Sequence, residues 1–156
     1  MGIGRAAAAA GDWGTGVGGA ASLPTPGGVA RLGVESAQNM LNAVTDGARS
    51  ATVFRAAAAV ADWRPASPST QKIKKDGSGQ TPQLQFTENT DILATVARTP
   101  AAQQGRLFCV GFAAVSHDLL ENAQAKRLRT QVQLLVCNID PAALGPDPQR
   151  QRLLDT

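Results

Sequence analysis

The chain has 156 residues, 43% of them hydrophobic and 17% charged, a composition that indicates a single globular domain and excludes a disordered protein. Its net charge is only +3, and the basic residues are spread out except at 72–75 and 126–129, so we expect no nucleic-acid partner. No apolar run approaches the ~20 residues that span a bilayer, and the alanine-rich start does not have the pattern of a signal peptide, so we expect a cytoplasmic protein without membrane contact.

The first half of the chain alternates expected helices and strands. The alanine run of residues 1–10 predicts a helix. The glycine-rich stretch 14–22 leads into a turn-rich loop and a short strand that ends at Val34. Residues 35–48 repeat apolar side chains at the spacing of an amphipathic helix. Residues 51–61 are apolar except for one arginine, which predicts a strand buried on both faces, as in a parallel sheet.

The second half continues this alternation. Residues 90–99 predict a helix with Thr90 as its N-cap and Pro100 beyond its end. The other expected elements are a half-exposed strand at 83–89, a buried strand at 106–114, a helix at 116–130 capped by Ser116 or Asp118, and a strand at 132–138. Strands alternating with helices predict an α/β domain with a mainly parallel sheet.

A carboxylate follows the first apolar strand. Ligands of parallel sheets bind outside the carboxyl ends of the strands, and Asp62, Phe112 and Asn138 all fall at such ends. Burying an unpaired carboxylate is costly. Asp62 therefore either begins a turn or accepts hydrogen bonds from a ligand.

Three lysines follow ten residues later, at positions 72, 74 and 75. A solvated loop is one interpretation of this run. In the other, Lys72 and Lys74 lie on one side of an extended segment and act as point charges for phosphate groups. The surrounding Pro, Gly and Ser residues would let this segment move as a flap over a site.

Four other features carry less weight. Residues 14–19 spell G-x-G-x-x-G, but a dinucleotide site needs a strand before the motif and a helix within it. His117 begins an expected helix, so capping or solvation outweighs catalysis. Cys109 and Cys137 lack a partner at metal-ligand spacing and are expected to be free thiols in a reducing compartment. The cations at 126–129 close a helix, where the helix dipole alone favours them.

Several segments occur in the order typical of one family: "MGIGRAAAAA", "SLPTP", "AAAVADWRPASPSTQKIKK", "TDILATVA", "FCVGFAA" and "NAQAKRLR…LLVCN". On these the chain resembles the phosphopantothenate–cysteine ligase domain, the C-terminal half of a bifunctional enzyme whose other half is a flavin-dependent decarboxylase. The resemblance covers about residues 1–140 and leaves 141–156 as a divergent tail. It implies a Rossmann-like, three-layer α/β fold.

The resemblance also implies an activity. Such ligases join 4′-phosphopantothenate to L-cysteine in coenzyme A biosynthesis, using CTP and Mg²⁺ and passing through an acyl-cytidylate. They are homodimers, and this chain is expected to hold neither an FMN site nor protein ligands for a metal.

Matching positions imply the site residues. The catalytic candidates are Lys72 and Lys74, supported by Lys75. The nucleotide-binding candidates are Ala57, Ala58, Asp62, Lys72, Thr90, Asp91, Ile92, Leu93, Phe112 and Lys126. Asn138 ends the last matching strand.

The chain also departs from the family pattern. The family's first strand and its I-S-N-x-S-S-G motif are missing, and 14–22 looks like a shortened second strand. Val115 replaces an acid, and Thr130 replaces a second lysine. We therefore expect an incomplete ligase domain. The alternative is a catalytically impaired remnant that keeps only nucleotide binding or dimerisation.

Overall fold

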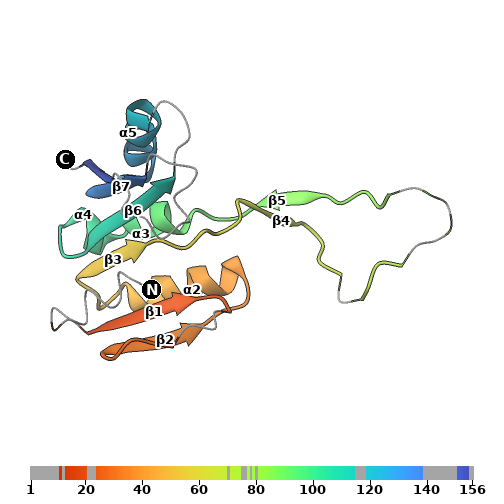
Figure 1. The fold of residues 1–156 in the computed structure, drawn as a ribbon, viewed down its shortest axis with the longest axis horizontal. Coiled ribbons are helices and arrows are strands. Elements are labelled where there is room, and N and C mark those ends of the chain that lie inside the picture. The colour runs from red at the N-terminus through yellow and green to blue at the C-terminus, as the bar shows by residue number, and fades with distance from the viewer. Residues whose placement is uncertain are drawn as a thin grey trace.

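The computed structural model of the chain describes residues 11, 13–20, 24–69, 71–74, 77, 79, 81–114, 119–138 and 151–154. Its elements, in chain order, are β1 (Gly14–Gly18), β2 (Val29–Gly33), α2 (Ala37–Gly47), β3 (Val53–Ala56), β4 (Trp63–Pro65), β5 (Phe86–Glu88), α3 (Ile92–Ala97), α4 (Pro100–Gln103), β6 (Phe108–Ala114), α5 (Leu119–Thr130), β7 (Leu134–Asn138) and β8 (Gln151–Leu154) (Figure 1). The helix expected at 1–10, the caps Ser116 and Asp118, and His117 lie outside the described residues.

The main sheet has four strands in the order β3-β6-β7-β8. The first three are parallel, with Ala56 opposite Gly111 and Gly111 opposite Leu135, and β8 runs antiparallel to β7. The predicted α/β class and mainly parallel sheet are confirmed. Since β3, β6 and β7 run in the same direction, their carboxyl ends form one edge of the sheet.

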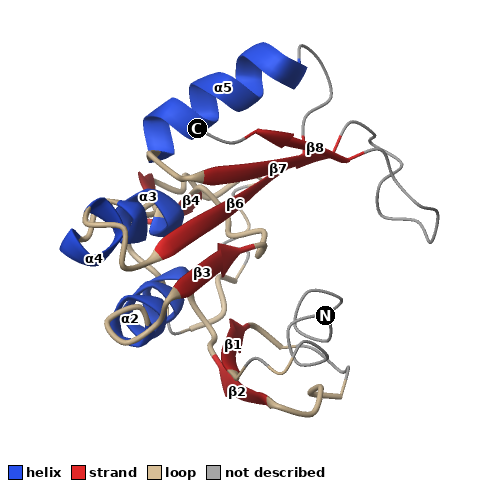
Figure 2. Ribbon diagram, turned by 90° about the vertical axis from the view of Figure 1, so that its left-hand side faces the viewer, coloured by secondary structure: helices blue, strands red, loops and turns tan. Residues whose placement is uncertain are grey.

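A second, smaller sheet consists of β1 and β2, which pair in parallel. The glycine-rich stretch expected as a shortened strand thus begins with a real strand. In both ribbon views β1, rather than β2, lies on the side toward β3 (Figures 1 and 2). No described strand pairs with β3 on the side away from β6.

The core lies between the main sheet and the row of helices α2, α3 and α5, in which α3 contacts both of the others. Small and β-branched side chains fill it, and the fully buried positions include Val96, Leu107, Cys109, Leu135 and Cys137. Among the described residues the helices thus form one layer over one face of this sheet (Figure 2). None of these helices is long and apolar enough to cross a membrane.

Two details of the predicted elements are wrong. The strand expected at 51–61 spans only Val53–Ala56 and is not buried on both faces, since Val53 is 43% exposed at the edge of the sheet. The cap of α3 is Asp91 rather than Thr90, because the Asp91 carboxylate accepts a hydrogen bond from the amide of Ala94 at 2.9 Å. Pro100 does lie beyond the end of α3, where it begins the short helix α4.

Strands β4 and β5 form an antiparallel ribbon. We call this ribbon, together with the loop between its two strands, the arm. The arm projects away from the two sheets (Figure 1). The strand predicted at 83–89 is therefore present in part, as β5, and the predicted flap residues Lys72 and Lys74 lie in the outer loop of the arm.

Candidate functional site

The carboxyl edge of the main sheet brings together three of the predicted segments. β3 stops opposite Gly111, so Ala57 and Ala58 leave the sheet beside Phe112, and both alanines are exposed. The start of α3 packs against the same part of β6: a Cβ atom on Gly111 would lie 2.7 Å from Cδ2 of Leu93. The segment 57–62, the middle of β6 and the start of α3 thus surround one edge.

Lys126 reaches this edge from α5. Its Nζ donates a hydrogen bond to the carbonyl oxygen of Phe112 at 3.1 Å, and both residues are partly buried. The ammonium group also acts on the neighbouring strand, where it opposes the rise that burial causes in the pKa of Cys137. By strand alternation, the Phe112 side chain points to the face opposite Leu93. A ligand at this edge can therefore contact residues from both faces.

The start of α3 is fixed by a charged contact. Asp91 caps the helix through one carboxylate oxygen and lies 3.8 Å from a guanidinium nitrogen of Arg129 through the other. Arg98 donates to the carbonyl oxygen of Arg129 at 3.2 Å. Ile92 and Leu93 are buried in the core, so only their backbone groups are available to a ligand, whereas Thr90 and Asp91 are exposed.

Asp62 lies where the chain enters the arm. Its side chain is exposed and has no hydrogen-bond or ion-pair partner among the described residues. Its carbonyl oxygen accepts from the amide of Asn89 at 2.7 Å. The side-chain amide of Asn89 donates to the carbonyl oxygen of Ala61 at 2.8 Å and accepts from Arg64 at 2.9 Å. These bonds hold Asp62 next to Thr90 and leave its carboxylate open to a ligand.

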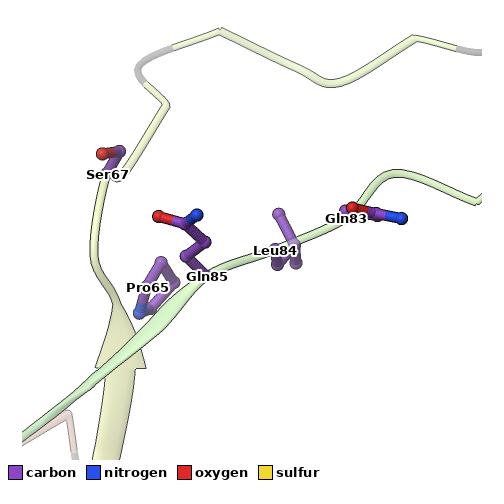
Figure 3. Close-up of a pocket in the computed structure, with 5 residues that line it drawn as sticks. All are labelled: Pro65, Ser67, Gln83, Leu84 and Gln85. Atoms are coloured by element: carbon purple, nitrogen blue, oxygen red, sulfur yellow. The ribbon is translucent and has the colours of Figure 1, made fainter.

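The structure does not bring the flap lysines to this edge. Lys72 and Lys74 are exposed in the outer loop of the arm, which stands away from the sheet (Figure 1), and Lys75 lies outside the described residues. A hollow of about 210 Å³ also belongs to the arm rather than to the sheet edge, and is lined by Pro65, Ser67, Gln83, Leu84 and Gln85 (Figure 3).

Sequence reasoning missed three polar residues at this edge: Arg64, Asn89 and Arg129. Asn89 precedes the predicted helix start, and asparagine is common at such turns, but only the fold shows that it contacts residues 61–64. Asn138 ends β7 at the same edge, as predicted. Within the described ranges, no three His, Cys, Asp or Glu side chains lie close enough to hold a metal ion together.

Comparison with known proteins relates the chain to coenzyme A biosynthesis. The family model of the DNA/pantothenate metabolism flavoprotein C-terminal domain matches residues 1–154. The coenzyme A biosynthesis bifunctional protein CoaBC of Vibrio cholerae is 40% identical over 136 residues, which are 87% of this chain and 33% of that protein. The same protein of Escherichia coli is 40% identical over 141 residues, 88% of this chain and 34% of that protein. The chain thus spans about a third of the length of these curated relatives.

A solved structure has a similar fold. The crystal structure of the C-terminal domain of CoaBC superposes with a TM-score of 0.72 at 28% sequence identity. This superposition covers 87% of the present chain and 61% of the other.

Proposed function

Because the chain belongs to the family of the DNA/pantothenate metabolism flavoprotein C-terminal domain, and matches the C-terminal part of the coenzyme A biosynthesis bifunctional protein, we propose that it ligates 4′-phosphopantothenate to L-cysteine with CTP. One observation carries this proposal: the exposed carboxylate of Asp62 lies beside the start of α3, and the start of α3 packs on β6 next to Phe112, whose carbonyl oxygen Lys126 contacts. This arrangement offers an acceptor and a cation to one nucleotide. The proposed substrates are soluble metabolites, so we place the protein in the cytoplasm.

The base of the nucleotide fits the segment 57–62. Ala57 and Ala58 are small and exposed, which leaves room for a flat ring. The carboxylate of Asp62 accepts a hydrogen bond from the exocyclic amino group of cytosine, which uracil lacks. Phe112 and Lys126, together with Thr90, Asp91 and the backbone of Ile92 and Leu93, form the rest of this nucleotide-binding site.

The proposed reaction has two steps. A carboxylate oxygen of 4′-phosphopantothenate attacks the α-phosphorus of CTP, an oxygen–phosphorus bond forms, and pyrophosphate leaves. The amine of cysteine then attacks the acyl carbon, a carbon–nitrogen bond forms, CMP leaves, and the amine loses a proton. Lys72 and Lys74 stabilise the charge on the phosphorus and on pyrophosphate. Their loop stands away from the sheet edge, so it must close over the nucleotide before the first step.

Mg²⁺ is the metal ion that the family resemblance implies. The described residues provide no cluster of side chains that fits a metal ion. Magnesium is held mainly by phosphate oxygens and water in nucleotide sites. We propose that it arrives with the triphosphate, and no step is assigned to it.

We further propose that the chain forms a homodimer through the arm. Pro65 lies opposite Phe86 in the ribbon, and alternation places Trp63 and Leu84 on the same face. Trp63, Phe86 and Leu84 are 60%, 58% and 51% exposed. An isolated two-stranded ribbon is marginally stable in water. A second copy of the chain that covers this face removes the exposed apolar surface and steadies the arm.

The remaining features of the expected fold are also proposals. Val110 and Val136 point to the face opposite α3 and are 8% and 7% exposed, which supports a further layer on that face.

The side of β3 away from β6 has no described strand partner. We propose that the family's first strand lies there, between β1 and β3, in one Rossmann-like sheet. The ligase-like region is proposed to span 1–140; Gln151–Leu154 of the following tail pairs with β7 as β8.

One observation favours the alternative, a remnant limited to nucleotide binding or dimerisation. Thr130 stands where the family has a second lysine. Its side chain is fully buried, and its hydroxyl donates to the carbonyl oxygen of Lys126 at 2.8 Å. This position therefore supplies no cation to the site.

The test measures binding and turnover in one preparation. Calorimetry should show CTP binding that Asp62→Asn weakens at least about tenfold, the loss expected for a hydrogen bond to a charged group. Pyrophosphate release that requires CTP and 4′-phosphopantothenate, followed by capture of cysteine, supports the ligase. Binding without release supports the remnant, and absence of CTP binding contradicts both forms of the site.

A further inference from the structure

At the base of the arm two antiparallel chain segments lie side by side. This contact, which we call the crossing, connects the two halves of the proposed nucleotide site. Residues 61–64 enter the arm and residues 88–91 leave it. Asn89 makes hydrogen bonds across this crossing. We propose that Asn89 is a positioning residue that sets the distance between the base-reading segment 57–62 and the start of α3; this inference rests on the proposed function.

Asn89 is bonded to three residues of the entering segment. Its backbone amide donates to the carbonyl oxygen of Asp62 at 2.7 Å. Its side-chain amide nitrogen donates to the carbonyl oxygen of Ala61 at 2.8 Å, and its side-chain oxygen accepts from Arg64 at 2.9 Å. The same Arg64 nitrogen donates to the carbonyl oxygen of Glu88 at 2.9 Å. One residue thus uses its backbone and both ends of its side chain at this crossing.

The segment that Asn89 holds has few other restraints. The ladder between β3 and β6 ends at Ala56. Among the described residues, no backbone hydrogen bond from a neighbouring strand fixes 57–61, and the β4–β5 ladder begins only at Trp63. The position of Asp62 relative to Thr90 therefore depends on the first pair of the β4–β5 ladder and on the bonds that Asn89 makes.

Arg64 also decides which way the side-chain amide of Asn89 points. A guanidinium group only donates, so the amide oxygen must face Arg64 and the amide nitrogen must face Ala61. An aspartate at position 89 keeps an acceptor for Arg64 but places a second acceptor against the carbonyl oxygen of Ala61. Asn89→Asp therefore breaks the side-chain bond to Ala61 and retains the side-chain bond from Arg64 and the backbone bond to Asp62.

Calorimetric titration of the full chain with CTP and with UTP tests this role. We expect Asn89→Asp and Asn89→Ala to weaken CTP binding roughly tenfold, within the range for a lost hydrogen bond that leaves a carbonyl unpaired. UTP binding should weaken less, because the displaced Asp62 reads the amino group that only cytosine carries. The preference for CTP over UTP therefore falls, which a general loss of stability does not produce.

Gln103 provides the matched control. Its side-chain amide donates to the carbonyl oxygen of Ala97 at 2.8 Å, at the other end of α3. Gln103→Glu and Gln103→Ala remove a similar amide–carbonyl bond away from the site. They should lower the urea midpoint as the Asn89 variants do, while CTP affinity stays within about twofold of the wild-type value.

The outcomes separate this inference from the proposed function. Wild-type CTP binding that the Asn89 variants leave unchanged overturns the positioning role and leaves the proposed function standing. No CTP binding by the wild-type chain overturns the proposed function, and the positioning role with it. If both Asn89 variants fail to fold, Arg64→Gln keeps Asn89 and releases the orientation of its amide. A lower preference for CTP in this variant supports the inference, and an unchanged preference overturns it.

Discussion

Gly111 is the point where β6 passes beneath α3. A Cβ atom there would lie 2.7 Å from Cδ2 of Leu93 and 2.8 Å from Cδ1 of Leu135. Gly111→Ala should therefore destabilise the chain by about 1–3 kcal/mol, the usual cost of overpacking a core. The measurement is the free energy of unfolding in urea. Gly47→Ala is the control, because nothing lies within 4 Å of its added methyl group, and alanine is the better helix former; a similar loss in both variants would contradict the close-packing argument.

Cys109 connects burial to the pH dependence of stability. Burial raises the pKa of its thiol from 9.0 to about 11. In the unfolded chain the thiol loses its proton near its ordinary pKa, whereas in the folded chain it keeps the proton up to about pH 11. The free energy of unfolding should thus be highest below pH 9. It should fall between pH 9 and 11, by roughly 2–3 kcal/mol at 1.36 kcal/mol per pKa unit.

Urea unfolding at pH 8 and at pH 10.5 measures this loss. Cys109→Ala should remove most of the difference, since it removes the thiol with the largest rise in pKa and leaves only Cys137, whose rise Lys126 opposes. An equally steep fall in that variant would assign the pH dependence to other residues.

Candidate site residues could be predicted from the sequence where the side chain alone suggests the function. Asn138 could be placed at the carboxyl end of β7 from an apolar run followed by a polar residue. The same pattern placed Asp62 directly after a strand, whereas β3 ends at Ala56 and Asp62 lies just before β4. Asn89 and Arg64 could not, because their roles depend on contacts between segments that are about 25 residues apart in the chain. Spacing along the sequence contains no signal for such a crossing.

In the proposed homodimer, the arm is the element that the second copy of the chain steadies. Phe86→Ser should shift the chain from dimer to monomer, because it removes an aromatic side chain that is 58% exposed at the centre of the apolar face. Aromatic anchors of this kind dominate the energy of interfaces. Light scattering after size-exclusion chromatography measures the change. Leu128→Ser, at a leucine of α5 that is 71% exposed, is the control and should leave the mass unchanged; a monomeric wild-type chain would contradict the dimer.

Elements were predicted well in type and less well in their ends. The strand expected at 51–61 stops at Ala56, where the chain leaves β6, and among the described strands β6 is its only hydrogen-bonded neighbour. An apolar run alone does not reveal whether a strand will be paired on both sides. The cap of α3 was displaced by one residue, from Thr90 to Asp91, because either side chain can accept the capping bond.

At the scale of the whole molecule, alternation of strands and helices predicted the α/β class and the parallel sheet, while the projecting arm was not predicted. The sequence 64–82 showed a Pro/Ser-rich loop, but its length and composition do not determine whether it lies over the site or away from it. The structure places it away. Closure of this loop is therefore the large motion that the proposed reaction requires.

This geometry predicts a separation between binding and turnover. Lys72→Gln should reduce pyrophosphate release about 100-fold or more, because it removes a charge that acts on the transition state. CTP affinity should fall far less, since in the proposed site the nucleotide is held by Asp62, Phe112 and Lys126. The fold should not change, because Lys72 is exposed in a loop outside the core.

The measurement needs a protein that releases pyrophosphate in a CTP-dependent reaction. If the present chain does not do so, a version extended upstream to include the family's first strand is used. Positioning of the second substrate contributes several kcal/mol to such reactions, and we propose that the family's first strand supplies this positioning. Arg49→Gln is the control, because Arg49 is an exposed cation of the main body that pairs with Asp46 at 3.6 Å, away from the sheet edge. Equal losses of CTP affinity and of turnover in Lys72→Gln would show that Lys72 acts on the bound nucleotide before the reaction begins, and the proposed loop closure would then precede binding.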